Sequence, residues 1–317
     1  METSRRTSTQ SDAIRRLRSL ASNPQAQAEY ACTLLAPRTR RDELMAALEA
    51  VASTPVPDAR PRLLDLYDHF AAQEGKRDRG AYVRSALLKA LRPLVEPGDR
   101  DLLLAAVTTY EYLPPAFDDA AGPLRAAGLI ALSDVDDELG RYHAVRLLAD
   151  RENTAKMSGE PAVTAAQVLG VQHELTPLFL YAMGPAHPDC SEVMAECLHQ
   201  LTAMPSAMVP SLIERHGESD NAIVLLGLFD LLLGHEDGPQ GLDFIADFLA
   251  ATRREDVYRY LVTTLVASGS PGLLEIVLAS ARFERDREKM AILARALALV
   301  EGDPAVDEVL TMINQSK

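Results

Sequence analysis

Tryptophan is missing from this 317-residue chain, aromatic residues make up only 5% of it, and cysteine occurs three times. The odd, sparse set Cys32, Cys190 and Cys197 does not form a disulfide framework, which needs an even number of cysteines at regular spacing. Free thiols persist in a reducing compartment, so we expect a cytoplasmic protein. Few aromatic residues beside abundant Ala and Leu favour helices.

Long hydrophobic runs are also lacking. The most apolar segment, Ala222–Gly234, is interrupted by Asp230 and is shorter than the ~20 residues that a membrane-spanning helix needs. The N-terminal segment METSRRTSTQ carries charge but no apolar core of the kind found in secretory signals, although its Arg and Ser content also fits a transit peptide. We expect residues 1–10 to be a flexible basic tail before a first helix near Ser11.

Positive charge is scarce outside the N-terminal segment. The chain carries a net charge of −14, and its first 41 residues hold eight arginines against three acidic residues, a charge of +5 that leaves −19 for the rest. An acidic body repels the phosphates of nucleic acids and the headgroups of anionic lipids. We therefore expect neither nucleic acid nor a membrane as a partner.

Strand signals are nearly absent, and a helical pattern repeats in their place. There is no long alternation of β-branched residues and no Asn-Gly turn. Comparing the chain with itself shows one pattern seven times, with an aliphatic residue second in six copies and Leu or Val last in all seven. The copies start 30–41 residues apart and are Tyr82–Leu91, Pro123–Leu132, Ala162–Val171, Glu192–Leu201, Ala222–Leu231, Asp256–Leu265 and Glu288–Leu297, with an earlier one at Asp42–Val51.

A second helical segment follows most copies of the pattern. Two helices of ~12 residues with short turns fill a 30-residue unit, so each unit is predicted to be a helical hairpin. The second segments are Arg62–Ala72, Asp101–Tyr110, Gly140–Ala149, Met208–Gly217 and Gly241–Ala251.

The segment GPLRAAGLIAL (Gly122–Leu132) shows why such hairpins should stack. It holds one charge, Arg125, and its apolar residues form two stripes instead of one. A surface helix of a bundle needs a single apolar stripe, whereas a helix inside a stacked array contacts its partner and both neighbouring repeats. One such segment suits the centre of an ordinary bundle, but seven aligned segments indicate a repeat array.

The repeated pattern resembles HEAT repeats, particularly the short bacterial kind related to those of phycobilisome lyases. YVRSALLKAL and PLRAAGLIAL match the V/L-R-x-A-x-x-x-A-L first helix, and the segments Met208–Asp220 and Gly302–Ile313 are similar to the second helix. Arg of the motif occurs at Arg84 and Arg125 and is replaced in later copies, which predicts irregular curvature.

This resemblance implies a fold and a mode of binding. The fold class is all-α: a right-handed α-solenoid of about eight antiparallel helical pairs. We expect a single array over residues 11–317, with a helical cap at about 11–38 and repeats at about 39–317. The family binds partners through an extended concave surface and shares no chemistry, and fold alone does not fix function.

Metal sites and catalytic motifs find little support. The segment HPDCSEVMAECLHQ offers His187, Cys190, Cys197 and His199, but its two cysteines lie two helical turns apart, ~10 Å, too far to share one ion directly. The acidic segment Ser133–Gly140 lacks the glycine and final glutamate of an EF-hand loop, and helix capping explains its acids. We predict no catalytic residues, no metal and no cofactor.

Two enzymatic alternatives come from the resemblance. Some HEAT-like proteins are DNA glycosylases, which need a basic groove with aromatic residues, and this chain is acidic and lacks Trp. A bilin-lyase-like or modification enzyme is the alternative that we keep, using the same groove. A pocket with convergent titratable groups would favour the enzyme, and a long open groove would favour a binding protein.

The candidate binding residues lie in the second helical segments, which usually line the concave face in the family. Tyrosine is favoured at interfaces because its apolar ring carries a polar tip, although these tyrosines could equally be half-buried packing residues. We predict a non-catalytic scaffold whose acidic, Tyr-containing groove binds a protein partner, namely a basic segment. The residues are Tyr67, His69, Tyr110, Tyr112, Tyr142, His143, Arg146 and Tyr181.

Overall fold

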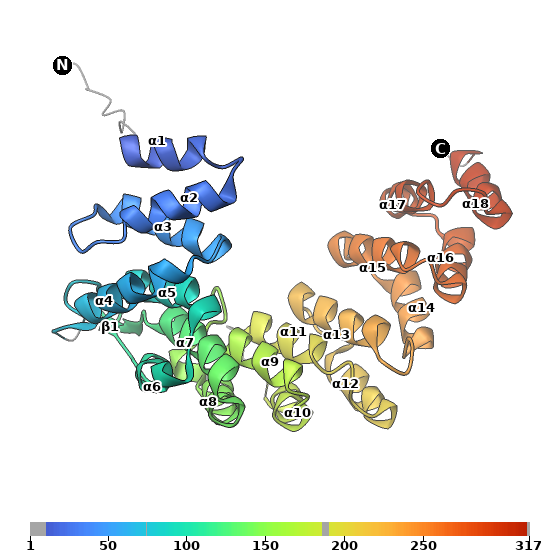
Figure 1. The fold of residues 1–317 in the computed structure, drawn as a ribbon. Coiled ribbons are helices and arrows are strands. Elements are labelled where there is room, and N and C mark those ends of the chain that lie inside the picture. The colour runs from blue at the N-terminus through green and yellow to red at the C-terminus, as the bar shows by residue number, and fades with distance from the viewer. Residues whose placement is uncertain (1–10, 74, 186–189, 316–317) are drawn as a thin grey trace, which may run out of the picture. The chain divides into compact units, whose positions relative to one another are not determined.

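The computed structural model describes residues 11–73, 75–185 and 190–315 (Figure 1). These residues are helical apart from turns, loops and one short two-stranded hairpin, which confirms the predicted all-α class. None of the described helices is long and apolar enough to cross a membrane. The predicted tail over residues 1–10 lies outside the described residues.

Backbone contacts divide the chain into two compact units, Met1–Gln172 (unit 1) and His173–Lys317 (unit 2). The single array predicted over residues 11–317 stays a prediction. Two α-helices lie within residues 11–38, where the sequence predicts a cap, and sixteen α-helices follow in the described chain.

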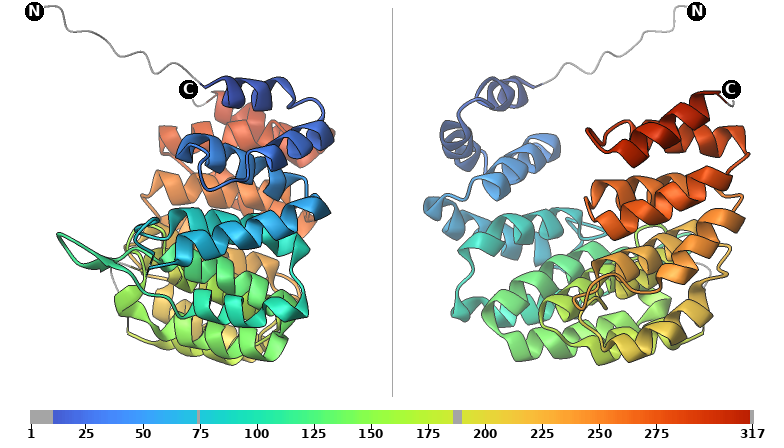
Figure 2. Two further views of the ribbon diagram at one scale, coloured as in Figure 1. Left: turned by 60° about the vertical axis from the view of Figure 1, so that its left-hand side comes forward. Right: turned by 90° about the vertical axis from the view of Figure 1, so that its right-hand side faces the viewer.

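Unit 1 is built from two layers of helices (Figure 2). Its α-helices are α1 (Asp12–Ser19), α2 (Pro24–Thr33), α3 (Arg41–Ser53), α4 (Arg60–Ala71), α5 (Tyr82–Leu91), α6 (Arg100–Val107), α7 (Gly122–Val135), α8 (Asp137–Ala149) and α9 (Ala162–Val171). The odd-numbered helices pack on one another in order, and α2, α4, α6 and α8 each pack on the odd-numbered helix that follows. The odd-numbered helices therefore form one layer, and the even-numbered helices cover it.

Unit 2 repeats this arrangement. Its α-helices are α10 (Leu175–Met183), α11 (Ser191–His199), α12 (Val209–His216), α13 (Ala222–Gly234), α14 (Leu242–Ala251), α15 (Glu255–Ala267), α16 (Pro271–Phe283), α17 (Arg287–Leu297) and α18 (Pro304–Gln315). Helices α11, α13, α15 and α17 pack in order, as do α14, α16 and α18.

The hairpin pairing in unit 1 differs from the sequence prediction by one helix. The sequence pairs Tyr82–Leu91 with the segment after it, but α5 packs more extensively on α4, which precedes it. Asp78, in the loop between α4 and α5, caps the start of α5. Its carboxylate accepts hydrogen bonds from the backbone N–H groups of Val83 and Arg84, at 3.0 and 2.9 Å, and so joins the loop to the start of α5.

Helix α7 confirms the wide apolar arc predicted for GPLRAAGLIAL. Nine of its residues are buried, on more than one side. A Cβ added at Gly128 would lie 3.0 Å from the Cβ of Ala106 on α6, so glycine permits the two helix axes to approach closely. Arg125 is buried with the apolar residues, at 0% exposure.

Candidate functional site

Two of the predicted binding tyrosines lie in the core. Tyr67 on α4 is 6% exposed and Tyr181 on α10 is 7% exposed. Burial is the main cause that raises the pKa of Tyr67 to about 12. Both side chains are packing residues, which was the competing interpretation of the sequence. His69, on the last turn of α4, is half-buried, and its ring and carbonyl oxygen contact Arg77 at 3.2 Å.

Tyr110 and Tyr112 do not lie on a helix, which corrects their predicted placement. Helix α6 ends at Val107, and Tyr112 lies in strand β1 (Tyr112–Leu113), which pairs antiparallel with β2 (Asp118–Asp119). Two prolines follow β1 directly, and proline cannot continue a helix because it lacks the backbone N–H. The segment therefore turns back as a hairpin instead of extending α6.

Four of the eight predicted residues come together in one polar cluster beside this hairpin. Arg146 on α8 donates hydrogen bonds to the Tyr110 hydroxyl at 2.6 Å and to His143 Nδ1 at 3.3 Å. The Tyr110 hydroxyl donates to Asp150 at 2.7 Å. Burial raises the pKa of Tyr110, and burial together with Arg146 lowers that of His143.

The same cluster extends through Tyr112 and Asn153. The Tyr112 hydroxyl donates to Asn153 Oδ1 at 2.9 Å, and the Asn153 amide donates to Asp150 at 2.8 Å. Tyr142 lies on the exposed face of α8, with 68% of its surface in solvent.

Arg125 lies beneath the cluster and joins its parts. Its guanidinium contacts the Asp119 carboxylate at 2.5 Å and donates to the carbonyl oxygens of Thr109 and Asn153 at 3.0 Å. Its Cζ lies 4.1 Å from the centroid of the Tyr110 ring, which is a cation–π geometry.

A second buried arginine repeats this arrangement one helix pair earlier. Arg84 pairs with Asp78 at 3.4 Å and with Glu111, whose carboxylate also accepts the N–H of Gly80 at 2.9 Å. Asp78–Arg84 and Asp119–Arg125 share a six-residue spacing, so each pair ties a loop to the helix after it. Because these charges pair with one another, we interpret the cluster as a support for the loops.

The His and Cys side chains that the sequence analysis weighed as metal ligands are not brought together among the described residues. His187 lies outside them, Cys190 and Cys197 are buried, and His199 lies 54% exposed on α11. His199 Nδ1 instead lies 3.5 Å from Asp230 of α13, whose other oxygen accepts from the Tyr260 hydroxyl. In the part of the chain that the structure describes, no group of three His, Cys, Asp or Glu side chains is arranged to hold a metal ion.

The acidic segment Ser133–Gly140 acts as a helix cap. The Asp136 carboxylate accepts the N–H of Leu139 at 3.0 Å, at the first turn of α8. This satisfies a backbone donor that helix geometry leaves free and confirms capping for Asp136, whereas Asp134 pairs with Arg92 at 2.7 Å.

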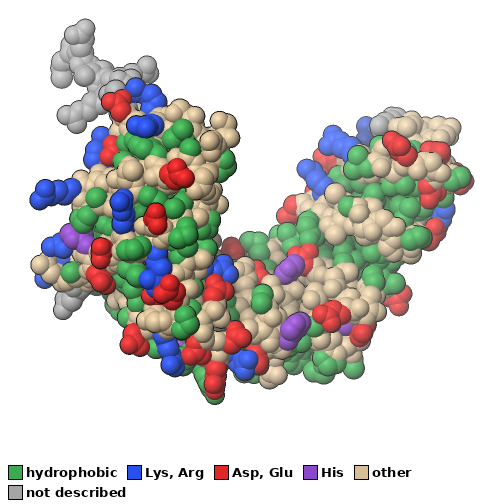
Figure 3. Space-filling model, in the orientation of Figure 1, with side chains coloured by type: hydrophobic (Ala, Val, Ile, Leu, Met, Phe, Trp, Pro, Cys, Tyr) green, Lys and Arg blue, Asp and Glu red, His purple; other side chains and the backbone are tan. Residues whose placement is uncertain are grey.

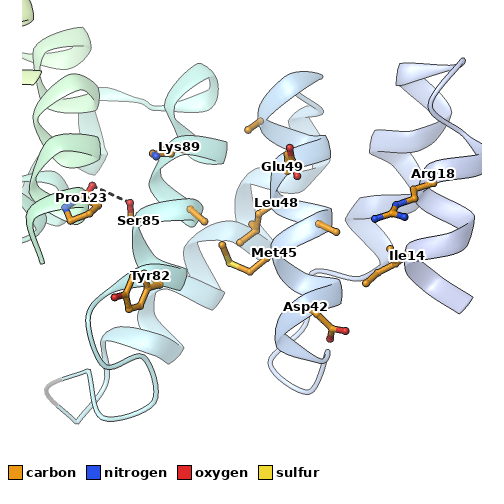
Figure 4. A pocket seen from close by; sticks show the side chains of 13 residues that line it. Ile14, Arg18, Asp42, Met45, Leu48, Glu49, Tyr82, Ser85, Lys89 and Pro123 are labelled. Atoms are coloured by element: carbon orange, nitrogen blue, oxygen red, sulfur yellow. Dashed lines mark hydrogen bonds between the residues drawn. The ribbon is translucent and has the colours of Figure 1, made fainter. Parts of the chain in front are cut away.

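An open groove in unit 1 runs over the odd-numbered layer, not over the predicted second helices (Figure 4). It has a volume of about 670 Å³ and is lined by α1, α3, α5 and the start of α7. Apolar Met45 and Leu48 lie in it, with Asp42, Glu49 and Lys89 as charged neighbours. A smaller cavity of about 310 Å³, bordered by α5, α7 and α9, shares Lys89 with it.

Unit 2 carries most of the chain's net negative charge, −12 against −2 in unit 1. Residues 173–252 contain twelve acidic residues, a single arginine (Arg215) and no lysine. Arg215 donates a hydrogen bond to the Gly184 carbonyl oxygen at 2.8 Å. The exposed acids are Glu214, Glu218, Asp220, Glu236, Asp237, Asp243 and Asp247, which we call the acidic surface of unit 2. Figure 3 shows Asp and Glu without Lys or Arg over α11 and α13.

The acidic surface and the groove were not predicted from the sequence. The signal for the first is present in the sequence, because residues 216–252 contain seven acidic residues and neither Lys nor Arg. A single net charge for all residues after 41 does not show this local excess of acidic residues.

Comparisons with protein-family models, with curated proteins and with solved structures gave no match.

Proposed function

We propose that the chain is a non-catalytic scaffold of the HEAT-like, right-handed α-solenoid type, and that it binds a basic protein segment on the acidic surface of unit 2. The layered helix order, the repeated Asp–Arg spacing and the motif of α5 and α7 support the fold part of the proposal. Repeat arrays of this type serve as extended binding surfaces.

The acidic surface is the observation that supports the proposed binding of a basic protein segment. Seven exposed carboxylates lie in α12, α14 and the adjoining loops, and among the described residues none of them forms an ion pair with Lys or Arg. Concentrating one charge sign raises the local concentration of oppositely charged ligands and speeds their association. Exposed charges are screened by salt, so binding should weaken as ionic strength rises.

The proposal changes the predicted contact residues. Tyr67 and Tyr181 are buried, and Tyr110, His143 and Arg146 are hydrogen-bonded within unit 1. The predicted Tyr-containing groove therefore no longer supports the proposed binding, whereas the predicted basic partner is retained.

The test is the affinity for a fluorescent Lys/Arg-rich peptide, followed by anisotropy at increasing salt. The test variant combines Glu214→Gln, Asp220→Asn, Asp243→Asn and Asp247→Asn. The matched control neutralises four exposed acids of unit 1 and combines Asp65→Asn, Asp68→Asn, Asp101→Asn and Glu138→Gln. Both variants change the net charge equally, so they separate a localised site from general attraction.

We expect the test variant to bind about tenfold more weakly, since four exposed pairs at a few tenths of a kcal/mol each are lost. The control should keep the wild-type affinity. Equal losses in both variants would indicate attraction by net charge alone, and an absence of binding by the wild-type chain would refute the proposal.

A further inference from the structure

The even-numbered layer of unit 2 holds an open groove between α14 and α16, which we call the α14–α16 groove. Its volume is about 430 Å³. One wall is formed by Ala246 and Ala250 of α14, and the other by Ile276, Ala279 and Phe283 of α16. The ring of Phe283 is 81% exposed. Because alanine side chains are short, the two helices leave an apolar hollow between them at the surface.

Helix α16 has apolar residues on two faces. Ile276, Ala279 and Phe283 follow the i, i+3, i+7 spacing of one helix face. A different set faces the core and is buried, namely Leu273, Val277, Leu278 and Ala281. In α7 a similarly wide apolar arc is buried by neighbouring helices, whereas the second face of α16 borders a groove.

A buried lysine holds the two walls of the groove together. Lys289 is 8% exposed, and its Nζ lies 3.3 Å from the Leu249 carbonyl oxygen of α14 and 3.4 Å from the carboxylate of Glu284, which follows α16. On the other side of α14, the ring of Phe248 packs on that of Phe229 of α13, with centroids 4.9 Å apart. The groove is therefore preformed, which lowers the free-energy cost of binding a ligand in it.

Two carboxylates of the acidic surface border the groove. Asp243 precedes Ala246 by three residues and Asp247 precedes Ala250 by three residues, so both lie beside the groove wall on α14. Both are exposed, and among the described residues neither forms an ion pair with Lys or Arg. They lie within the first two turns of α14, and the groove is therefore acidic near the start of that helix.

The other charges at the groove are balanced or lie at its opposite end. Of the two glutamates that line the groove, Glu275 pairs with Arg282 at 3.2 Å, and the other pairs with the buried lysine. Exposed Arg253 and Arg285 lie in the loops after the C-terminal ends of α14 and α16. A ligand with an apolar face and basic residues near one end matches this distribution.

We propose that the α14–α16 groove binds an amphipathic helix of a partner protein, with its apolar face in the groove and its basic residues against Asp243 and Asp247. This inference rests on the proposed function, because it specifies the form of the basic segment. Helices bound in this way present apolar residues at i, i+3 or i+4 and i+7 on one side, whereas an extended segment directs successive side chains to opposite sides.

The test compares two fluorescent peptides of identical Leu, Ala and Lys composition, bound to the full chain and followed by anisotropy. The amphipathic peptide, of about 18 residues or five helical turns, has its leucines on one face and its lysines beside them. In the scrambled peptide the leucines are distributed around the helix. Since the net charge is the same, a difference in affinity reports the apolar face.

The first variant fills the groove at exposed positions, where a larger side chain should not disturb folding. It combines Ala250→Gln and Ala279→Gln, and glutamine is a good helix former. The matched control combines Ala251→Gln and Ala267→Gln, which change exposed alanines of the same unit that do not line the groove. Circular dichroism confirms that each variant is folded.

The second variant, Phe283→Ser, removes the exposed ring at the groove. Its control is Leu299→Ser, because Leu299 is 76% exposed in unit 2 and does not line the groove. Two independent variants make the test insensitive to an unexpected effect of either one on folding.

We expect the wild-type chain to bind the amphipathic peptide about tenfold more tightly than the scrambled peptide, because apolar side chains leave water in the groove. Both groove variants should lose this preference and keep the affinity for the scrambled peptide, and both controls should behave like the wild type.

Equal affinity of the wild-type chain for the two peptides would overturn the inference and leave the proposed function intact, whereas binding of neither peptide would refute both. A preference that survives in both groove variants would place the apolar contact elsewhere and also overturn the inference. Self-association of the wild-type chain that both groove variants abolish would instead assign the groove to a second copy of this chain.

Discussion

The guanidinium of Arg125 lies 2.5 Å from the carboxylate of Asp119, and the two side chains are 0% and 1% exposed. Such a pair tolerates burial because further partners satisfy it, here two backbone carbonyls and the ring of Tyr110. Arg92 and Asp134 form a pair of similar length, 2.7 Å, with side chains 50% and 40% exposed. The two pairs differ in burial more than in distance, so their energetic roles should differ.

Replacing Arg125 by Met should destabilise unit 1 by about 3–5 kcal/mol, because Asp119 would remain buried and charged without its partner. The control Arg92→Met should cost less than about 1 kcal/mol, since its pair is exposed to water and salt. Urea unfolding followed by circular dichroism measures both. Similar costs for the two variants would contradict a structural role for the buried pair.

Gly227 marks the closest approach of α11 and α13. A Cβ added there would lie 2.6 Å from the Cα and carbonyl oxygen of Ala195, which are backbone atoms and cannot rotate away. Gly227→Ala should therefore cost about 1–3 kcal/mol through overpacking. Gly234→Ala in the same helix meets only a methyl carbon of Thr202 at 3.4 Å, and better helix propensity should make it neutral or stabilising by up to about 1 kcal/mol. Thermal unfolding of the two variants measures both changes in stability. A Gly227→Ala variant as stable as the wild type would rule out the close approach.

The tyrosines of unit 1 should separate into packing and surface residues. Tyr67→Ala removes a side chain that is 6% exposed and should cost about 3–5 kcal/mol, the range for large aromatic residues in cores. Tyr142→Ala, at 68% exposure, should change stability by less than about 0.5 kcal/mol. Chemical unfolding of the two variants measures both changes in the free energy of unfolding. If Tyr142→Ala proves as costly as Tyr67→Ala, Tyr142 cannot be a surface residue.

The all-helical class and the helix positions were predictable because their signals are local. The apolar period of Gly122–Leu132, for example, requires burial on several sides, and α7 has it. The pairing of helices was not predictable, because it depends on packing between side chains of α4 and α5 whose partners the sequence spacing does not identify. The burial of individual tyrosines was not predictable for the same reason. Tyr67 and Tyr142 look equivalent in the sequence, and only their neighbours in the other layer distinguish them.

Two histidines of unit 2 have pKa values displaced in opposite directions. The hydrogen bond to Asp230 is the main cause that raises the pKa of His199 above its ordinary value of 6.5. Burial is the main cause that lowers the pKa of His216, whose Nε2 lies 2.9 Å from the Ala182 carbonyl oxygen. The protonated form is favoured at the first site and the neutral form at the second.

These shifts predict opposite contributions to stability as pH changes. Protonated His199 stabilises unit 2 fully below its unfolded pKa, near 6.5, and this contribution disappears as pH rises through the higher folded value. Neutral His216 stabilises unit 2 above that pH, and its contribution is lost as pH falls through the lower folded value. An NMR titration of the imidazole rings should give a pKa above 6.5 for His199 and below it for His216. Asp230→Asn should lower the pKa of His199 and leave that of His216 unchanged. An unchanged pKa of His199 in this variant would show that Asp230 is not the cause.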